Sequence, residues 1–277
     1  MKDKNISVVV NTCDDYRDVL IFFFAAIDEY WPDLKFPIVI NSELINYTEY
    51  KANSHTVKVS PSPWGERLIA TLNSIQSEFV LLLYDDFILE DYVRQDDIIK
   101  AMNIMLNNSN AAVVYLIDTK LPVNKEDSDI QFLEVKTNCD YRLNSAPGLW
   151  RKKDLLSFID DLDNPWAWEV FGTYRSITKS KKFYTLNKSF PNIFPYNYSK
   201  GGAVYRGKWV KEVVWNKIQK YNLDIDLNVR GFSDPILFEK RTFLWKIKFF
   251  IAGLQMIGLK AFIPLFNSFK LKISKWF

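Results

Sequence analysis

The sequence contains few cysteine, histidine and glycine residues. It has 2 Cys, 1 His and 9 Gly among 277 residues. Two cysteines, Cys13 and Cys139, are too few for a disulfide scaffold and fit a reducing compartment. Neither a P-loop nor the G-x-G-x-x-G signature of dinucleotide-binding folds is present. These absences exclude a disulfide-stapled module and a nucleotide-binding loop of either of those two kinds.

Acidic residues are absent from position 240 onward, where eight of the 36 Lys and Arg residues lie. Residues 1–239 therefore carry 28 basic and 33 acidic side chains, a net charge of −5, although the whole chain has a net charge of +3. An acidic body with a basic, apolar tail predicts that the tail binds a surface. Nucleic-acid binding is not expected, because the basic excess is confined to this apolar tail.

Long hydrophobic runs are also absent. No apolar signal region precedes the strand-like segment at Ile6–Val10, so we expect a protein that is not secreted. In the tail, the longest uncharged stretch, Phe249–Leu259, has 11 residues, whereas about 20 are needed to span a bilayer. Over residues 243–260 the apolar side chains of the tail follow helical spacing, and Lys246, Lys248 and Lys260 are interspersed among them. This pattern is typical of a helix that lies in the membrane interface. A helix docked on the body and a dimer contact are the alternatives.

The rest of the chain has the composition of a large globular domain, with 48% hydrophobic residues. Strand-like and helix-like segments alternate through about the first 120 residues, which predicts a parallel α/β sheet. Residues 121–239 are less periodic and richer in Trp, Pro and Gly. One domain with a C-terminal appendage follows from this pattern.

The most informative segment is Phe79–Glu90, an apolar run that ends in Asp85 and Asp86 and then turns apolar again. Such a run is typical of a parallel strand covered on both faces. Ligands of open α/β sheets bind outside the carboxyl ends of strands, so the two carboxylates predict a hard-oxygen site for Mg²⁺ or Mn²⁺ with a diphosphate. The alternative is a solvated turn after the strand.

The order of parts in the first half is strand, polar loop, helix, two strands, an Arg-bearing helix and the acidic strand. This order resembles that of the GT-A nucleotide-sugar glycosyltransferases found in bacterial capsule and O-antigen polysaccharide assembly. The resemblance covers about residues 5–215. It implies a GT-A fold in which a mixed, mainly parallel sheet lies between helices.

The resemblance also implies which residues hold the nucleotide-sugar donor. Thr12, Asp14 and Tyr16, after the first strand, would lie near the base, and Arg67 near the phosphates or uracil. Asp85 and Asp86 would be the acidic motif that holds the ribose and a divalent metal. Alternatively, Thr12 and Asp14 only cap the following helix, and Arg67 is a solvated helix residue.

The sequence departs from the family pattern at the metal site. The motif is Tyr84-Asp85-Asp86, with Tyr where the first Asp of Asp-x-Asp often stands. Many members also use a late His as a metal ligand, but the single His55 comes far too early and is expected in a loop or on the surface. A metal site would therefore depend on Asp86, diphosphate oxygens and water.

A second constellation is Asn164-Pro-Trp166-Ala-Trp168-Glu169, about 80 residues after the acidic pair. In inverting members of the family, a carboxylate from this region deprotonates the acceptor hydroxyl, which predicts Glu169 as the base. An apolar setting between two Trp would raise its pKa, and Trp166 and Trp168 could stack on an acceptor sugar. The alternative is that both Trp pack in the core and Glu169 begins a helix. Asp161 and Asp163 are the fallback bases.

A third constellation is the segment Tyr198–Trp209, which contains Gly201-Gly202 and Arg206-Gly207-Lys208. Glycines permit close backbone approach, while Arg206 and Lys208 would neutralise a leaving diphosphate. A glycine turn between two short strands with surface charges is the alternative.

Together these features predict a catalytic domain at 1–239, with a donor half (about 1–120) and an acceptor half (121–239), and a membrane-associating segment at 240–277. We expect transfer of a sugar from a nucleotide donor, a UDP-sugar in the first instance, to a hydroxyl of a lipid-linked glycan. The enzyme would be inverting and metal-dependent, cytoplasmic, peripheral to the inner face of the cell membrane, and a candidate homodimer. The alternatives are a nucleotidyltransferase, which should have a Gly-rich loop at 11–15, and a non-catalytic membrane-bound glycan-binding or scaffold protein.

Overall fold

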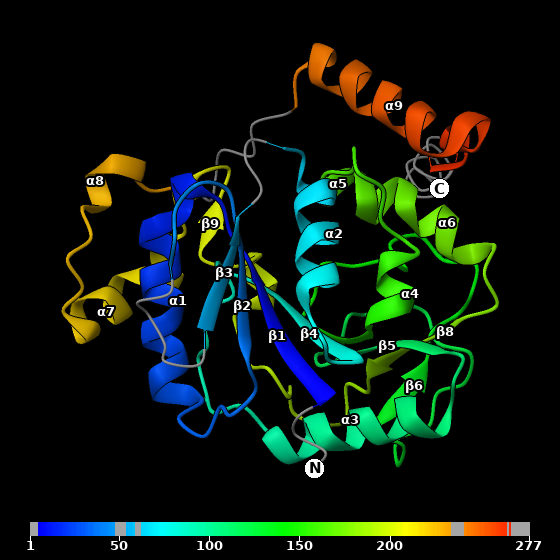
Figure 1. Cartoon of the computed structure of the whole chain (residues 1–277), viewed down its shortest axis with the longest axis horizontal. Coiled ribbons are helices and arrows are strands. Elements are labelled where there is room, and N and C mark those ends of the chain that lie inside the picture. Colours follow the sequence, from blue (N-terminus) through cyan, green and yellow to red (C-terminus); the bar gives the residue numbers. More distant parts are fainter. Residues whose placement is uncertain (1–4, 48–53, 59–61, 234–240, 265, 267–277) are drawn as a thin grey trace, which may run out of the picture.

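In the computed structural model, one mixed eight-stranded sheet lies between two groups of helices (Figure 1). The structure describes residues 5–47, 54–58, 62–233, 241–264 and 266. The strand order is β3-β2-β1-β4-β7-β5-β8-β6, and only β6 and β7 oppose the direction of the other six. The predicted mixed, mainly parallel sheet is confirmed. Its strands are β1 (Ile6–Asn11), β2 (Ile38–Ser42), β3 (Ser54–Lys58), β4 (Phe79–Tyr84), β5 (Ala111–Tyr115), β6 (Phe132–Glu134), β7 (Gly148–Arg151) and β8 (Lys182–Leu186).

The two central strands β1 and β4 run side by side in parallel, with Val8 opposite Leu81. Their side chains are buried almost throughout, because helices cover both faces of the sheet, which explains the uninterrupted apolar runs. Apart from the buried Ser7 near the start of β1, polar residues begin at the carboxyl ends of these strands, at Asn11 and at Asp85. The polar residues of the first half that could carry chemistry therefore lie at the carboxyl ends of the central strands.

The less periodic second part of the chain completes the same sheet. Strand β7 inserts antiparallel between β4 and β5, and β8 extends the sheet beyond β5. A separate hairpin, β9 (Val204–Tyr205) and β10 (Lys208–Trp209), follows. The parts before and after about residue 120 thus share one hydrophobic core.

The helices differ in length between the two parts. The long ones belong mainly to the donor half and the C-terminal region, whereas residues 152–177 form short consecutive turns. The helices are η2 (Asp14–Tyr16), α1 (Arg17–Tyr30), α2 (Trp64–Ser74), α3 (Gln95–Asn107), α4 (Lys152–Leu156), α5 (Pro165–Ala167), the π-helix η3 (Trp168–Gly172), α6 (Thr173–Ile177), η4 (Tyr198–Lys200), α7 (Lys211–Tyr221), α8 (Leu227–Arg230), α9 (Phe243–Ile257) and η5 (Gly258–Ala261).

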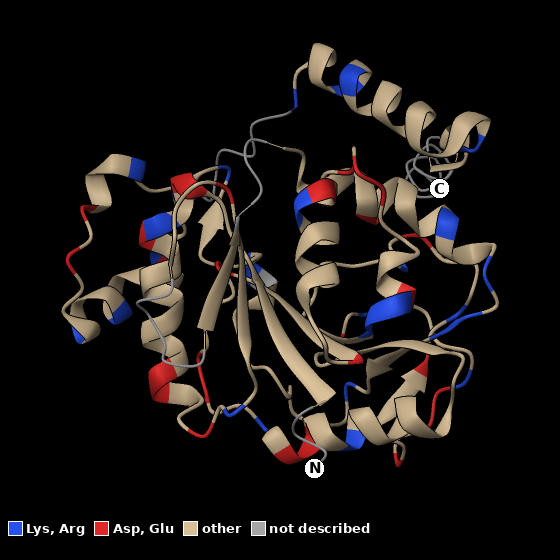
Figure 2. Cartoon of the chain, viewed as in Figure 1, with Lys and Arg blue, Asp and Glu red and all other residues tan. Residues whose placement is uncertain are grey.

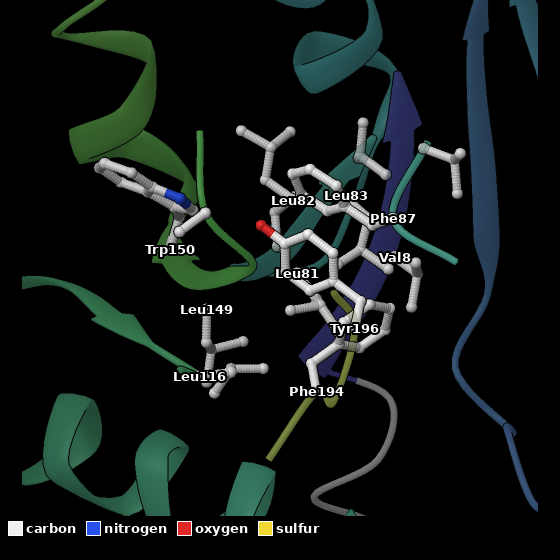
Figure 3. Close-up of a cluster of buried hydrophobic side chains, with 14 of the residues drawn as sticks. Val8, Leu81, Leu82, Leu83, Phe87, Leu116, Leu149, Trp150, Phe194 and Tyr196 are labelled. Atoms are coloured by element: carbon white, nitrogen blue, oxygen red, sulfur yellow. The ribbon is translucent and has the colours of Figure 1, made fainter. Parts of the chain in front are cut away.

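The core continues on both sides of the acidic pair. Leu81 to Leu83 precede it on β4, and Phe87 follows it, stacked on Tyr196 with ring centroids 4.3 Å apart (Figure 3). An isolated bridge between Leu89 and Tyr196 extends this contact. Because buried segments flank the two carboxylates, their backbone is held in place by the fold.

The C-terminal appendage is helical, as expected, and α9 ends at Ile257 with Gly258 as its C-cap. Gly258 has φ +59, a conformation that glycine adopts without strain. Figure 1 shows α9 lying over α5. Helix α9 also contacts η3, where the ring centroids of Phe249 and Phe171 are 5.0 Å apart. The predicted boundary at 239–240 lies outside the described residues, as do residues 267–277 of the predicted membrane segment.

Candidate functional site

The acidic pair lies between the ends of β1 and β4. The amide of Asp85 donates to the carbonyl of Asn11, and its Oδ2 accepts from the hydroxyl of Thr12 at 2.6 Å. Burial and the charge of Asp86 raise the pKa of Asp85, against the Thr12 hydrogen bond and the positive charge of Arg230. Desolvation raises the pKa of Asp86 to about 7. Thr12, predicted to lie near the base, is thus in direct contact with the acidic motif.

The glycine loop predicted to approach the donor reaches Asp86. The amide of Ala203 donates to the backbone carbonyl of Asp86 at 2.8 Å. Gly202 has φ +97, and a Cβ there would lie 2.6 Å from Asp86 Oδ2. Only glycine fits this contact, because both the conformation and the space exclude a side chain.

The cations predicted on this loop lie at the tip of a hairpin. Arg206 (φ 52) and Gly207 (φ 80) are both left-handed, as in the two-residue turn that matches the twist of paired strands. The side chains of Arg206 and Lys208 are exposed, and the Arg206 guanidinium lies 5.4 Å from the ring of Tyr205. The structure of this segment is therefore that of the alternative, a glycine turn between two short strands with surface charges.

A cation whose charge acts on the acidic pair is Arg230, which sequence reasoning missed. Its guanidinium donates to both carboxylate oxygens of Asp18 at 2.6 and 2.7 Å and lies 4.5 Å from the ring centroid of Tyr16. Its charge opposes the raised pKa of Asp85. The sequence carries a signal only for a short helix, since Asp226 caps α8 and Gly231 ends it. Nothing in the sequence relates Arg230 to Tyr16 and Asp18, which lie more than 200 residues earlier.

The residues after β1 differ in role. The carboxylate of Asp14 accepts from the amides of Leu44 and Ile45 at 3.0 and 3.2 Å and so ties this loop to the one after β2. The helix-capping alternative for Asp14 is wrong, because no side chain caps η2. Tyr16 lies under Arg230, and burial together with nearby negative charge raises its pKa to about 12.

Arg67 on α2 is buried and reaches the same loop. Its Nη1 donates to the carbonyl of Thr12 at 3.1 Å, and its Nη2 lies 3.7 Å from Oε1 of Glu43. The alternative of a solvated helix residue is wrong. Arg67 therefore positions the loop after β1 at the residue whose hydroxyl contacts the acidic pair.

Glu169 lies on the π-helix η3, near Tyr84, the residue that precedes the acidic pair. Its Oε1 accepts from the amide of Ser145 at 2.7 Å, and burial raises its pKa in spite of this bond. Burial raises the pKa of Tyr84 first, and the charges of Glu169 and Asp86 raise it further. The fold therefore brings Glu169 and the acidic pair, some 80 residues apart in sequence, around one tyrosine.

The two tryptophans beside Glu169 have different environments. Trp168 is fully buried, donates from its indole nitrogen to the carbonyl of Phe158 at 3.1 Å, and lies 5.7 Å from Trp64 between ring centroids. The prediction that Trp168 binds an acceptor is wrong, because a π-helix turns this side chain into the core. Trp166 is 61% exposed.

The fallback base Asp163 has a structural role. Its carboxylate accepts from Arg175 at 2.6 and 2.8 Å and is buried. A buried, fully paired carboxylate of this kind does not reach a substrate.

A cavity of about 550 Å³ opens beyond Tyr198. Burial raises the pKa of Tyr198, a hydrogen bond with Asn144 lowers it, and the charges of Glu169 and Asp118 raise it. Tyr198 therefore lines the cavity and lies near Glu169. Sequence reasoning missed this hollow, which combines aromatic rings with polar groups as sugar sites do. Its lining is Glu90, Asp118, Lys120, Lys188, Phe190, Asn192, Tyr196, Asn197 and Tyr198.

The acidic pair offers few protein ligands to a metal. Among the described residues, no group of three His, Cys, Asp or Glu side chains converges as a cage. His55 lies exposed on β3, a surface position as expected although not a loop. Asp86 fits Mg²⁺ or Mn²⁺, which take one or two carboxylates and complete their shell with water and phosphate oxygens.

Comparison with solved structures identifies the fold. The chain matches the S. aureus TarS 1-349 structure with a TM-score of 0.50 and 13% identity, over 93% of this chain and 80% of that one. The same fragment in complex with UDP-GlcNAc matches with a TM-score of 0.44 and 13% identity, over 82% and 69%. The galactosyltransferase LgtC matches with 0.33 and 16%, over 54% and 59%. Neither protein-family models nor curated proteins gave a match. On the first of these likenesses and on its own sheet order, the chain has the GT-A fold.

Proposed function

We propose that this protein is a glycosyltransferase that transfers a sugar from a nucleotide donor to a hydroxyl of a glycan. One observation carries the proposal. In a GT-A fold, Asp86 after the carboxyl end of β4 and a desolvated glutamate on η3 lie close enough to Tyr84 for both of their charges to raise its pKa. A donor site and a base on opposite sides of one reacting centre are what an in-line displacement needs.

The donor would bind over the ends of β1 and β4. Asp86 holds the metal and Asp85 supports the metal or the ribose, while Thr12 and Tyr16 line the base side. A bound Mn²⁺ or Mg²⁺ would neutralise charge on the diphosphate. Because Asp85 already accepts from Thr12, Asp86 is the better placed carboxylate for this role.

Glu169 is the proposed base. Its raised pKa makes it a stronger proton acceptor than an ordinary glutamate. In the reaction, the acceptor oxygen bonds to the anomeric carbon as the bond to the diphosphate breaks, and the hydroxyl proton passes to Glu169. A single displacement of this kind inverts the configuration at that carbon.

Arg230 is the proposed cation for the leaving diphosphate, in addition to Arg206 and Lys208 on the hairpin. It is held by Asp18 beside the acidic pair, so it needs no rearrangement to act. The hairpin cations would have to move inward when the loop closes over the donor.

The acceptor would enter from the side of Tyr198 and Trp166. The cavity beyond Tyr198 offers aromatic rings and hydrogen-bonding groups to a sugar. We propose a lipid-linked glycan of cell-surface polysaccharide synthesis, such as a capsule, as the acceptor, at the inner face of the cell membrane.

The test is a thermal-shift series. Wild type, Asp86→Ala and Asp91→Ala are heated with UDP, GDP, CDP or CMP, each with and without Mn²⁺; UDP comes first because TarS was crystallised with UDP-GlcNAc. We expect one nucleotide to stabilise wild type and the exposed-residue control Asp91→Ala but not Asp86→Ala. No stabilisation of a folded wild type by any nucleotide would favour the non-catalytic glycan-binding protein.

A nucleotidyltransferase is the second enzymatic candidate, and the product distinguishes it. The loop at 11–15 contains no glycine to cradle a triphosphate. Incubation with a nucleotide sugar should release a nucleoside diphosphate. Release of pyrophosphate from a nucleoside triphosphate would instead support the nucleotidyltransferase.

A further inference from the structure

The C-terminal segment 243–266 has two apolar faces, and one of them is docked. Gly253 is buried against Phe171, and a Cβ there would lie 2.4 Å from that ring. Phe249 packs on the same ring, and Ala261 joins the cluster after the turn at Gly258. This contact covers the side of the helix that faces η3.

The opposite face is apolar and uncovered. Leu244, Ile247 and Ile251 follow helical spacing on α9 and are 40 to 61% exposed. Eight of the 18 large hydrophobic side chains that are exposed among the described residues lie in this segment, so exposed apolar side chains are concentrated here. The eight are Phe243, Leu244, Ile247, Ile251, Leu259, Phe262, Ile263 and Phe266.

The charges around this face all have one sign. Arg241, Lys246, Lys248 and Lys260 are exposed, and no Asp or Glu lies from 240 onward. Figure 2 shows blue and no red along α9, whereas both colours mix on the rest of the molecule. An apolar stripe bordered only by cations is complementary to a bilayer with anionic headgroups.

The geometry of the segment does not suit a helix that crosses a membrane. By length and composition, Phe243–Pro264 has 22 residues with a mean hydropathy of 1.4, enough for a span. However, Gly258 breaks it, and α9 alone has 15 residues, about 22 Å at 1.5 Å per residue, against a hydrocarbon core of about 30 Å. Its docked face is also occupied by Phe171.

We propose that the exposed face of α9 and η5 binds the surface of an anionic lipid bilayer, with the axis of α9 parallel to it. This proposal is independent of the enzymatic one, because it concerns binding alone. Its consequence for the site is geometric. Phe171, which holds α9, is two residues after Glu169 on the same π-helix, so the bilayer would lie on the acceptor side of the molecule.

The test is sedimentation of the full chain with vesicles of phosphatidylcholine, alone or mixed with phosphatidylglycerol. Leu244→Glu/Ile247→Glu/Ile251→Glu places charge on the exposed face and leaves the docked face intact. The matched control, Leu106→Glu/Ile130→Glu/Leu162→Glu, changes three comparably exposed residues elsewhere. Lys246→Gln/Lys248→Gln/Lys260→Gln removes only the charge.

We expect wild type and control to bind the anionic vesicles and the face variant to bind at least about tenfold more weakly. The lysine variant should lose most of the preference for anionic over neutral vesicles, as should wild type in high salt. The melting temperatures of all four proteins should agree, which shows that the variants fold.

Two outcomes would overturn the proposal. One is equal binding by the face variant and the control, or none by folded wild type. The other is a wild-type dimer in light scattering that becomes a monomer in the face variant without vesicle binding, since the face would then join two copies of the chain. Nucleotide-dependent stabilisation, measured on the same samples, reports separately on the donor site.

Discussion

At the scale of single residues, the position of Asp86 depends on the absence of a side chain nearby. A Cβ at Gly202 would collide with both its carboxylate and its carbonyl, whereas a Cβ at Gly201, also left-handed, would have no atom within 4 Å. Alanine at either position strains the backbone, but only alanine at Gly202 also displaces Asp86. Comparing the two variants therefore separates the free-energy cost of strain from that of displacing Asp86.

We therefore expect Gly202→Ala to abolish nucleotide-dependent stabilisation and to lower the free energy of unfolding by about 1–3 kcal/mol. Gly201→Ala should have only the strain cost and keep nucleotide binding. Thermal shift with and without UDP and Mn²⁺ measures both effects. Equal loss of nucleotide binding in the two variants would show that strain alone is responsible.

Glu169 gives a prediction with opposite signs for stability and activity. Its pKa is raised in the folded protein, so the folded state binds its proton more tightly than the unfolded state does. Stability is therefore lost as pH rises from the ordinary Glu pKa, about 4.3, through the raised one. Glu169→Gln removes this loss and keeps an oxygen for the Ser145 amide.

We expect Glu169→Gln to melt at the same temperature as wild type near pH 4 and at an equal or higher temperature near pH 8. Transfer should fall by at least about 100-fold, with donor binding unchanged. In wild type, kcat/KM should decrease as pH falls through the raised pKa of Glu169. Retention of most of the transfer activity by this variant would contradict the base assignment.

Replacing the two tryptophans of residues 164–169 should lower the free energy of unfolding by different amounts. Trp168→Ala creates a core cavity beside Trp64 and should cost about 3–5 kcal/mol. Trp166→Ala should change stability by less than about 0.5 kcal/mol, because the side chain is mostly exposed. Denaturant titration measures the difference, and a raised KM for acceptor in Trp166→Ala alone would support its acceptor role.

At the scale of elements, the docked face of α9 depends on one small residue. Gly253 lets the helix approach Phe171, and any side chain there overlaps the ring. The extra residue per turn of η3 turns Trp168 into the core while Glu169 faces Ser145. The helix and the proposed base thus share a supporting element.

Gly253→Val should separate α9 from η3, because it weakens the docking of the helix by about 1–3 kcal/mol. Hydrogen exchange should accelerate in 243–257 and remain unchanged in β1 and β4. Gln255→Val, at an exposed position of the same helix, is the control and should leave the exchange unchanged. Equal acceleration in both variants would show that valine destabilises the helix without involving Phe171.

At the scale of the whole molecule, the sheet and the appendage are held together by a small cluster. Among the described residues, the buried core of the body is one cluster that excludes α9, and a second cluster around Ala167, Phe171 and Ala261 joins the appendage to it. The body therefore has its own hydrophobic core, as an independently folding domain does.

Removal of residues 241–277 should leave a cooperatively folded protein that binds nucleotide as the full chain does. The melting temperature should decrease by only a few degrees, since little buried area is lost. Thermal shift with and without nucleotide checks both points. Loss of cooperative unfolding would show that the appendage is part of the domain.

The sequence alone determined the mainly parallel sheet of the first part, the acidic pair at a strand end and the charged tail. Alternation of apolar and polar segments and the abrupt end of a buried run are local signals, which a chain carries without its neighbours. The roles of Thr12 and Glu169, which came from the order of motifs, stay predictions. The same order placed Trp168 wrongly, because a π-helix turn changes which side chain faces inward and leaves no mark in composition.

Only the tertiary structure decided which distant groups meet. Arg230 contacts Asp18 and approaches Asp85, the hollow forms beyond Tyr198, and α9 buries one of its two apolar faces. Each of these features brings together residues that are tens to hundreds of positions apart in the sequence. Periodicity identifies the faces of an element, but the partner of each face is fixed by packing in three dimensions.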